Sequence, residues 1–166
     1  MTKTSNSDHS PRAAHRAALL LFVGLIAAGA LAVAASAKMA QDRLLLMTEA
    51  GERDIAVEVA ETPEDMAMGL MFRTNLPEGS GMLFPSPAPR EANMWMHNTY
   101  IPLDMVFIRA DGVVHRIESM TQPLSDDIIA SKGEVLAVLE LPGGAASRLG
   151  LKAGDRVKHR VFQSAP

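Results

Sequence analysis

The segment from Met94 to Asp104 carries the residues of this chain that are best suited to chemistry. Its eleven residues hold the chain's only tryptophan and only tyrosine beside a histidine, an amide and a carboxylate. A plain structural strand needs only Val, Ile and Thr, whereas Trp and His carry polar edges that need partners when they are buried. We therefore expect a functional site around this segment.

The mixture of side chains predicts a binding site for a small ligand. Trp95 would supply an apolar wall, and Arg73, His97, Asn98 and Asp104 would supply polar contacts. Ligand pockets generally combine apolar walls with a few polar groups of this kind. We expect an unidentified small molecule or peptide, bound without catalysis and without a cofactor.

Hydrolysis is the alternative function. His97 could act as a general base, oriented by Asp104 or Glu140, because imidazole titrates near neutral pH. A hydrolase would also need a nucleophile, and the sequence has no Gly-x-Ser-x-Gly motif.

A structural or protein-interaction domain is the third interpretation. Trp95 would then be an ordinary core residue, while Asn98 and Asp104 would hydrogen-bond to nearby backbone groups, as these residues do in turns. Arg73 could bind a carboxylate or phosphate through its planar fork. It could equally pair with an acid of the same chain, Glu58 or Glu61.

A soft metal ion is a further possibility for the same segment. Met94, Met96 and His97 offer the thioether and imidazole ligands that Cu(I) prefers. On a strand, however, Met94 and Met96 would share one face and His97 the other, which favours packing. The three methionines within residues 66–71 likewise fit the packing of a short helix. We therefore expect no metal.

The first 37 residues have the form of an export signal. A basic polar segment is followed by an uncharged apolar run of about 19 residues, 17–35, and by Ala35-Ser36-Ala37. This order marks a secretory signal peptide, although the run is also just long enough to remain as a membrane anchor. We expect an exported protein that is periplasmic or anchored on the outer face of the inner membrane, with membrane contact only through residues 17–35 if they stay uncleaved.

The composition of the exported part excludes several functions. From Lys38 onward there are 13 basic and 18 acidic side chains, a net charge of −5. Nucleic acids are bound by basic surfaces, so no nucleic-acid partner is expected. The chain has no cysteine, which excludes thiol catalysis and thiolate metal sites.

Residues 44–163 are expected to form one β-rich domain behind a tether of residues 38–43. Alternation of Ile55, Val57 and Val59 indicates a half-buried strand. Thr62 and Pro63 then predict the start of a short helix over 63–69, because Thr is a good N-cap and Pro suits the first helical position.

The remaining chain reads as short strands separated by turns. Residues 76–89 are rich in Gly, Pro and Ser, with an apolar island at 82–84, and Ala110-Asp111-Gly112 is a strong hairpin turn. A polar loop is expected over 121–133, and strands over 104–108, 113–117, 134–141 and 156–162. This pattern predicts a mainly β sandwich or barrel with one short helix laid across it, preceded by the signal or anchor helix.

Several motifs occur together in one order along residues 44–161. They are Glu58-Val59-Ala60 with Thr62-Pro63-Glu64, Gly69-Leu70-Met71-Phe72-Arg73, Gly81-Met82-Leu83-Phe84, Trp95-Met96-His97-Asn98-Thr99 with Pro102-Leu103-Asp104, Leu139-Glu140-Leu141-Pro142-Gly143 and Gly154-Asp155. Together they resemble domain-of-unknown-function family 192, a group of small bacterial and archaeal proteins that are often exported. The resemblance implies a compact β-rich fold and no assigned biochemical role. This chain departs from the family pattern at Met66 and Met68, where relatives tend to carry arginines, and at His97, where relatives often carry lysine.

Overall fold

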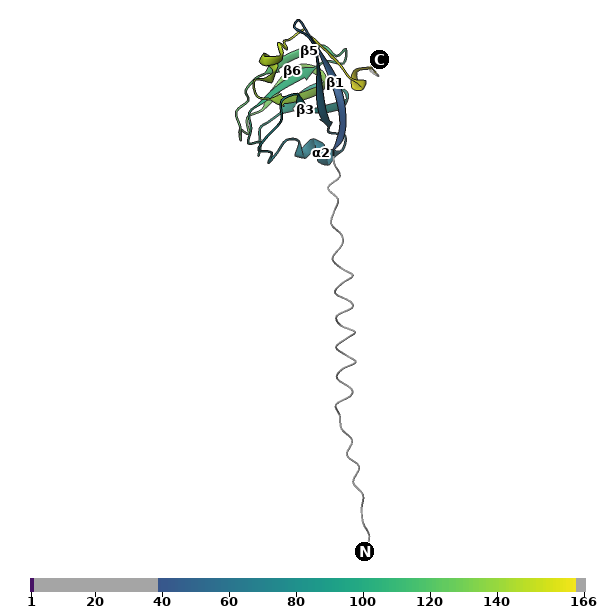
Figure 1. Cartoon of the computed structure of the whole chain (residues 1–166), viewed down its shortest axis with the longest axis vertical. Helices are drawn as coiled ribbons and strands as arrows, with labels where there is room; N and C mark the ends of the chain where they lie inside the picture. The colour runs from purple at the N-terminus through teal and green to yellow at the C-terminus, as the bar shows by residue number, and fades with distance from the viewer. Residues whose placement is uncertain (2–38, 164–166) are drawn as a thin grey trace. The chain divides into compact units, whose positions relative to one another are not determined.

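The chain folds into a mainly β domain. The computed structural model describes Met1 and residues 39–163, and within residues 39–163 it shows seven strands and three short helices (Figure 1). The strands are β1 (Ala40–Thr48), β2 (Gly51–Val59), β3 (Ser80–Met94), β4 (Leu103–Ile108), β5 (Val114–Glu118), β6 (Ile129–Pro142) and β7 (Arg156–Lys158). The helices are α2 (Pro63–Met68), α3 (Ala145–Leu149) and α4 (Arg160–Gln163).

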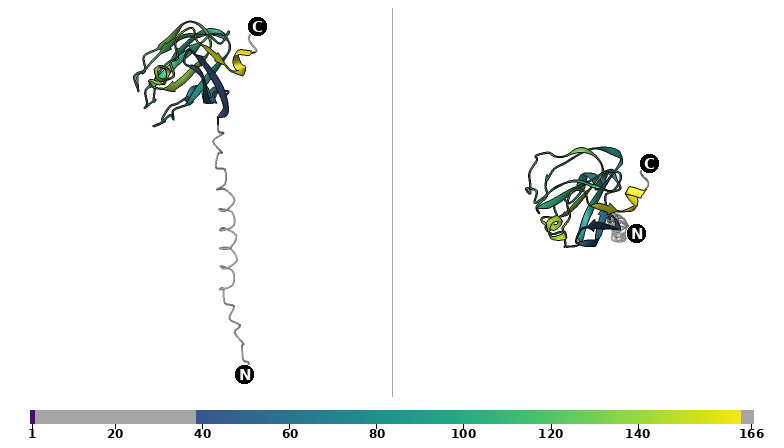
Figure 2. Two further views of the ribbon diagram at one scale, coloured as in Figure 1. Left: turned by 45° about the horizontal axis from the view of Figure 1, so that its top comes forward. Right: turned by 90° about the horizontal axis from the view of Figure 1, so that it is seen from above.

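All seven strands belong to one sheet that curls into a half-barrel (Figure 2). Their order is β5-β4-β6-β3-β2-β1-β7. Hydrogen bonds join the two edges at one end: the Val114 N–H donates to the Asp155 carbonyl at 2.8 Å, and the Val157 N–H donates to the Gly112 carbonyl at 2.8 Å. The prediction of a mainly β fold is therefore confirmed, and the sheet is a curled half-barrel.

The inside of the curled sheet is the first apolar layer. Ile55, Val57 and Val59 are all buried in it, as their alternation predicts. The layer is completed by residues from the other strands, including Leu44, Leu46, Leu83, Val106, Ile108, Leu139 and Val157.

A second apolar layer lies on the outer face of β3, β4 and β6. Side chains alternate along a strand, so Met82 and Phe84 point to this face while Leu83 points inward. Leu70 and Met96, which lie outside the strands, pack onto the same cluster. The candidate site described below is built in this layer.

The chain segment that connects β2 to β3 covers the second apolar layer. These strands pair in parallel, with Val57 opposite Gly81, so the chain must cross over between them. The crossover, residues 60–79, contains α2. Gly81 allows β3 to approach β6 closely, because a Cβ atom there would lie 2.6 Å from the Glu140 carbonyl oxygen of β6.

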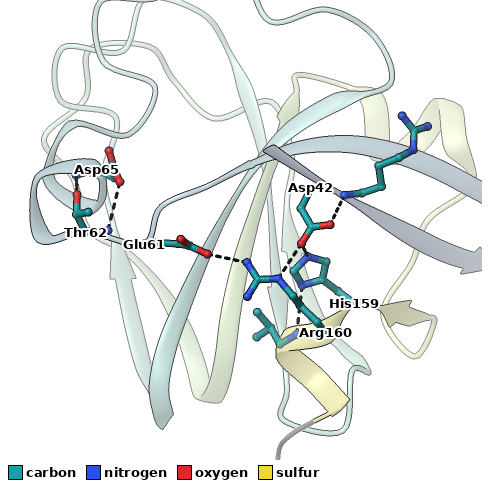
Figure 3. A network of polar contacts seen from close by, with 8 residues as sticks. Asp42, Glu61, Thr62, Asp65, His159 and Arg160 are labelled. Atoms are coloured by element: carbon teal, nitrogen blue, oxygen red, sulfur yellow. Dashed lines mark hydrogen bonds and ion pairs between the residues drawn. The ribbon is translucent and has the colours of Figure 1, made fainter. Parts of the chain in front are cut away.

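A polar network fastens the C-terminal helix beside the start of the crossover (Figure 3). The Asp42 carboxylate lies 3.0 Å from Nε2 of buried His159 and accepts a hydrogen bond from Arg160 at 2.8 Å. Arg160 also donates to Glu61 at 2.6 Å. The Val161 N–H donates to His159 Nδ1, so the ring proton lies on Nε2 and is donated to Asp42. The Arg160 hydrogen bond is the largest cause that lowers the pKa of Asp42 to about 2.

Several predicted boundaries were wrong. Residues 38–43 were expected to form a tether, yet β1 begins at Ala40, because Ala40 pairs with Val59 in the ladder to β2. No strand was predicted within the Gly-, Pro- and Ser-rich residues 76–89, yet β3 begins at Ser80. Its pairing with β6 shifts register between Pro85 and Arg90, so the prolines there do not break the ladder. The expected loop over 121–133 ends early, since Ile129 already pairs with Met94.

The C-terminal part also differs from expectation. The strand predicted over 156–162 ends at Lys158, where the chain turns into α4. The described residues hold three short helices instead of one. α3 follows Gly144, which adopts a left-handed φ of 79°, and Asp104 accepts the hydrogen bonds of its first N–H groups.

The predicted signal or anchor, residues 1–37, lies outside the described residues except for Met1. Within residues 39–163, no helix has the length and apolar character needed to cross a membrane.

Candidate functional site: a groove beneath helix α2

A groove separates α2 from the outer face of the sheet. We call it the α2 groove and divide it into an outer chamber of about 470 Å³ and an inner chamber of about 40 Å³. The two chambers adjoin each other, because both are lined by Met66, Ala67, Phe84, Met94 and Trp95. The groove therefore runs from the end of β3 to the end of α2.

The groove is present because α2 packs no buried side chain against the sheet. The ends of the helix hold it instead. The Thr62 hydroxyl accepts a hydrogen bond from the Asp65 N–H at 3.0 Å, and the Asp65 carboxylate accepts one from the Thr62 N–H at 3.2 Å. This capping box, with Pro63 at the first position, is a strong start signal, and Gly69 ends the helix as predicted.

The outer chamber has apolar walls and one polar end. Its walls include Phe84 of β3 and Val135 and Val138 of β6. Ser86, Arg90 and Asn93 also line it, and Arg90 Nε donates to Ser86 Oγ at 2.8 Å. The chamber suits a molecule with an apolar body and an anionic or polar group at the Arg90 end.

Glu140 lines the inner chamber and is the most unusual residue of the site. It lies on the central strand β6, between Met82 of β3 and Met105 of β4, and is 4 % exposed. Burial raises the pKa of its carboxyl to about 8. Among the described residues, its side chain has no hydrogen-bond or ion-pair partner.

The position of this carboxyl explains how it can lack a partner. Within the described chain, no fully enclosed side-chain nitrogen or oxygen atom is left without a hydrogen bond. The oxygens of Glu140 are therefore in contact with the inner chamber. Because its pKa is about 8, the carboxyl is mostly protonated at pH 7 and can donate a hydrogen bond into the chamber.

Trp95 and His97 also line the inner chamber. Their rings stack with centroids 4.8 Å apart and planes 24° apart, and Trp95 is 48 % exposed. His97 Nδ1 lies 2.6 Å from a carboxylate oxygen of Asp126. A proton shared along this contact belongs on Nδ1, which leaves the lone pair of Nε2 available to a ligand.

Asp104, a predicted site residue, binds backbone groups instead of facing the groove. Its carboxylate accepts hydrogen bonds from the N–H groups of Met120 at 2.8 Å, Gly144 at 2.9 Å and Ala146 at 2.8 Å. The residue is completely buried. Asp104 therefore joins β4 to the turn before α3, and the structure does not place it beside His97.

The sequence comparisons identify the family of this domain. The model of DUF192, described as uncharacterized ACR, matches residues 45–159. The chain belongs to DUF192. No curated protein matches it.

Two solved structures are similar to this DUF192 chain. One is a protein from Sinorhizobium meliloti 1021 described as a candidate transcription regulator. It is 42% identical, with 73% of this chain and 95% of that chain covered and a TM-score of 0.71. The other is a protein of unknown function from Novosphingobium aromaticivorans DSM 12444. It is 38% identical, with 77% of this chain and 91% of that chain covered and a TM-score of 0.72.

Arg73, also predicted to bind ligand, forms an internal ion pair in this DUF192 domain. Its guanidinium meets the Glu58 carboxylate through two hydrogen bonds of 2.7 and 2.5 Å. The hydrogen bond to Glu58 raises the pKa of Arg73 above its ordinary value. The pair ties the turn after α2 to β2, which is the internal alternative expected from the sequence.

Asn98 shapes the loop that carries His97. Its φ is 51°, in the left-handed region, and its carbonyl accepts a hydrogen bond from the Phe72 N–H at 2.8 Å. This contact joins the Trp95 segment of the DUF192 domain to the turn after α2, so the two walls of the inner chamber are held together.

Replacing Asn98 by alanine should lower the free energy of unfolding by about 1 kcal/mol, because a Cβ-bearing residue without a local polar side chain tolerates left-handed backbone poorly. Replacement by glycine, which adopts positive φ freely, should leave the free energy within about 0.5 kcal/mol of wild type. Urea unfolding of both variants tests this. Equal losses in the two variants would show that the amide side chain, and not the backbone conformation, matters at this position.

Of the three residues considered as copper ligands in the sequence, the structure brings two together and separates the third. Met96 is fully buried in the second apolar layer, where its sulfur accepts a hydrogen bond from Thr121 at 3.1 Å. Met94 and His97, by contrast, both line the inner chamber. The strand β3 ends at Met94, so the alternation that would have placed these two residues on opposite faces no longer applies.

Some groove residues were not singled out from the sequence. Asp126 lies 29 positions from His97, and nothing local links the two. Phe84 appeared only as part of an apolar island, and Ala67 carries no chemical signal. Glu140, by contrast, was named from the sequence, but only as a carboxylate that could orient His97; its isolation within the apolar run from Val135 to Leu141 is the signal that marks it in its own right.

Proposed function

We propose that this protein is an exported, non-catalytic module that binds a small ligand in the α2 groove. The observation that carries the proposal is the carboxyl of Glu140, which is 4 % exposed, lines the inner chamber and has no hydrogen-bond or ion-pair partner among the described residues. The oxygens of Glu140 open onto the inner chamber, and a polar group that is largely withdrawn from water gains free energy when it acquires a hydrogen-bond partner. A ligand that reaches the inner chamber would supply that partner. Export rests on the signal-like residues 1–37.

The lining of the groove indicates the chemistry of the ligand. The outer chamber favours an apolar body, and the exposed Trp95 ring offers a flat face for stacking. Arg90 at the outer end favours an anionic or strongly polar group. At the inner end, protonated Glu140 favours a hydrogen-bond acceptor, whereas its ionised form favours a cation.

The contacts of His97 favour binding over hydrolysis. Its carboxylate partner is Asp126, which is largely exposed, and neither Asp104 nor Glu140 hydrogen-bonds to it. Within residues 39–163, no serine or threonine hydroxyl hydrogen-bonds to the His97 ring. Thr99, the hydroxyl in the inner chamber, donates to the His97 carbonyl instead. An activated nucleophile would need contact with the base.

A nucleic-acid role is not proposed, although one similar structure is described as a candidate transcription regulator. From Lys38 onward the chain carries a net charge of −5. Binding to a phosphate backbone draws on clustered basic residues, and the α2 groove is lined by only one arginine and no lysine.

Blocking the groove tests the proposal. The probe is 8-anilinonaphthalene-1-sulfonate, which has an apolar aromatic body and one anionic group. Ala67 is exposed on α2 and lines both chambers, so Ala67→Phe should fill the groove without disturbing the core. We expect the dissociation constant of the probe to rise by about tenfold or more, which corresponds to about 1.4 kcal/mol.

The matched control is Ala153→Phe, because Ala153 is exposed in a turn away from the groove. This variant should bind the probe like the wild type. Fluorescence of the probe and quenching of Trp95, the chain's only tryptophan, give two independent readouts. Equal probe affinity in the wild type and both variants would contradict a ligand site in the groove.

A further inference from the structure

We propose that the inner chamber binds one monovalent copper ion, held by methionine thioethers and by Nε2 of His97. This inference rests on the proposed function, because it names a ligand class for the same groove. The thioethers available are those of Met66, Met68, Met71 and Met94, all of which line the inner chamber.

The soft donors gather from two separate parts of the chain. Met66 and Met68 lie on α2, Met71 follows it, and Met94 is the last residue of β3. Four of the chain's eleven methionines therefore meet in this one small chamber. Thioether ligands select Cu(I), and an imidazole ligand suits the same ion.

The two methionines of α2, Met66 and Met68, are not core residues, so core packing does not explain their presence, whereas Met94 is partly buried and packs against the second apolar layer. α2 buries no side chain, and Met66 and Met68 are exposed. A methionine has three rotatable bonds and a polarisable sulfur, so it can turn toward an ion without a change of backbone. Exposed methionines on one short helix beside a histidine are better suited to holding a soft ion than to packing.

His97 is already oriented as a metal ligand. Its Nδ1 faces Asp126 at 2.6 Å, and its ring stacks on Trp95. Metal-binding histidines almost always donate their second ring N–H to a carboxylate or carbonyl, which fixes the ring and leaves the other nitrogen for the metal. Asp126 would thus act as a positioning residue, and His97 Nε2 as the ligand.

The same surroundings disfavour hard and borderline ions. In the part of the chain that the structure describes, no three histidine or carboxylate side chains come together as a metal centre of that kind requires. Glu140 is the single carboxyl in the inner chamber. Zn²⁺, Ca²⁺ and Mg²⁺ therefore lack the ligands they need here.

The test is an anaerobic titration of the full-length protein with Cu(I), in competition with a chromophoric Cu(I) chelator. The wild type should bind one equivalent and lose Trp95 fluorescence as the ion enters. The double variant Met66→Leu/Met94→Leu keeps the apolar volume and removes two sulfurs. Its dissociation constant for Cu(I) should be about 100-fold higher than that of the wild type. Loss of an outer-shell partner weakens metal binding by about 10- to 100-fold, and loss of two direct ligands should weaken it at least as much.

Two further comparisons separate a site from general methionine chemistry. Met120→Leu removes an exposed methionine outside the α2 groove and should leave the Cu(I) affinity within about twofold of wild type, since it is not a ligand or an outer-shell partner. Asp126→Asn should weaken binding by about 10- to 100-fold, and Asp126→Glu should restore most of it. The single variant Met66→Leu, at an exposed position, serves if the double variant does not fold.

The inference is overturned if the wild type binds no Cu(I), or if the groove variants bind it as tightly as Met120→Leu does. The two experiments together show whether the copper proposal alone is wrong or the proposed ligand-binding function is wrong as well. If copper does not bind while Ala67→Phe still weakens the organic probe and Ala153→Phe does not, the groove is a ligand site for another ligand class. If both experiments show no effect of the groove, both proposals fall.

Discussion

Replacing Glu140 by glutamine should make the protein about 3 kcal/mol more stable than the wild type at pH 7, and about equally stable at pH 4. Burial raises the pKa of Glu140 from 4.5 to about 8, so folding favours the protonated form. The stability that comes from this preference is complete below pH 4.5 and is lost as the pH rises through 8. Glutamine resembles the protonated carboxyl in shape and never ionises.

Urea unfolding between pH 4 and pH 9 measures this difference. The wild-type curve should fall relative to that of Glu140→Gln across the interval from pH 4.5 to pH 8. Glu134→Gln is the matched control, because Glu134 is an exposed residue of the same strand, and it should follow the wild type. Parallel curves for Glu140→Gln and the wild type would show that Glu140 is ionised and solvated in the folded protein.

Replacing Asp104 by alanine should lower the free energy of unfolding by about 3–5 kcal/mol, because it removes a completely buried carboxylate and leaves three backbone N–H groups without their acceptor. Those groups belong to Met120, Gly144 and Ala146. A loss of this size is a large fraction of the stability of an ordinary domain. Asp104→Asn, which keeps two of the possible acceptor contacts at most, should have an intermediate effect.

The control for this prediction is Asp111→Ala. Asp111 is exposed and accepts one hydrogen bond, from the Val113 N–H at 3.0 Å, so its loss should cost about 1 kcal/mol or less. Urea unfolding with circular dichroism gives both values. If Asp104→Ala unfolds at nearly the same urea concentration as the wild type, its carboxylate is not structural, and its role as a ligand contact would regain support.

Elements with strong local signals could be predicted from the sequence. The alternation of Ile55, Val57 and Val59 needs only one buried face, and Thr62 with Pro63 sets the start of α2 through backbone hydrogen bonds within a few residues. The turn at Asp111-Gly112 is similarly local, and Gly112 has the positive φ of 76° that such a turn uses.

Elements that depend on distant partners could not be predicted in the same way. The prolines of residues 85–89 indicate a loop, and only the pairing of β3 with β6 on both sides of them makes a strand. α3 depends on Asp104, which lies about 40 positions earlier in the chain. Such contacts leave no periodic pattern in the sequence near the element itself.

In the candidate site, too, residues with a local sequence signal could be predicted, whereas contacts between distant residues could not. Trp95 and His97 could be selected because their types and proximity are unusual, and both line the inner chamber. The methionines of α2 were assigned to core packing, because the sequence does not reveal how far a helix stands from its sheet. The pairing of His97 with Asp126, instead of with Asp104 or Glu140, depends on the loop between β5 and β6.

The weak attachment of α2 has a consequence for how anything enters the groove. A helix of six residues is too short to be stable by itself, and α2 adds no buried side chain that would hold it against the sheet. Its local opening therefore costs far less free energy than global unfolding, and its amide protons should exchange with solvent much faster than those of β6. A ligand can therefore reach Glu140 when α2 opens briefly, while the strands beneath it stay paired.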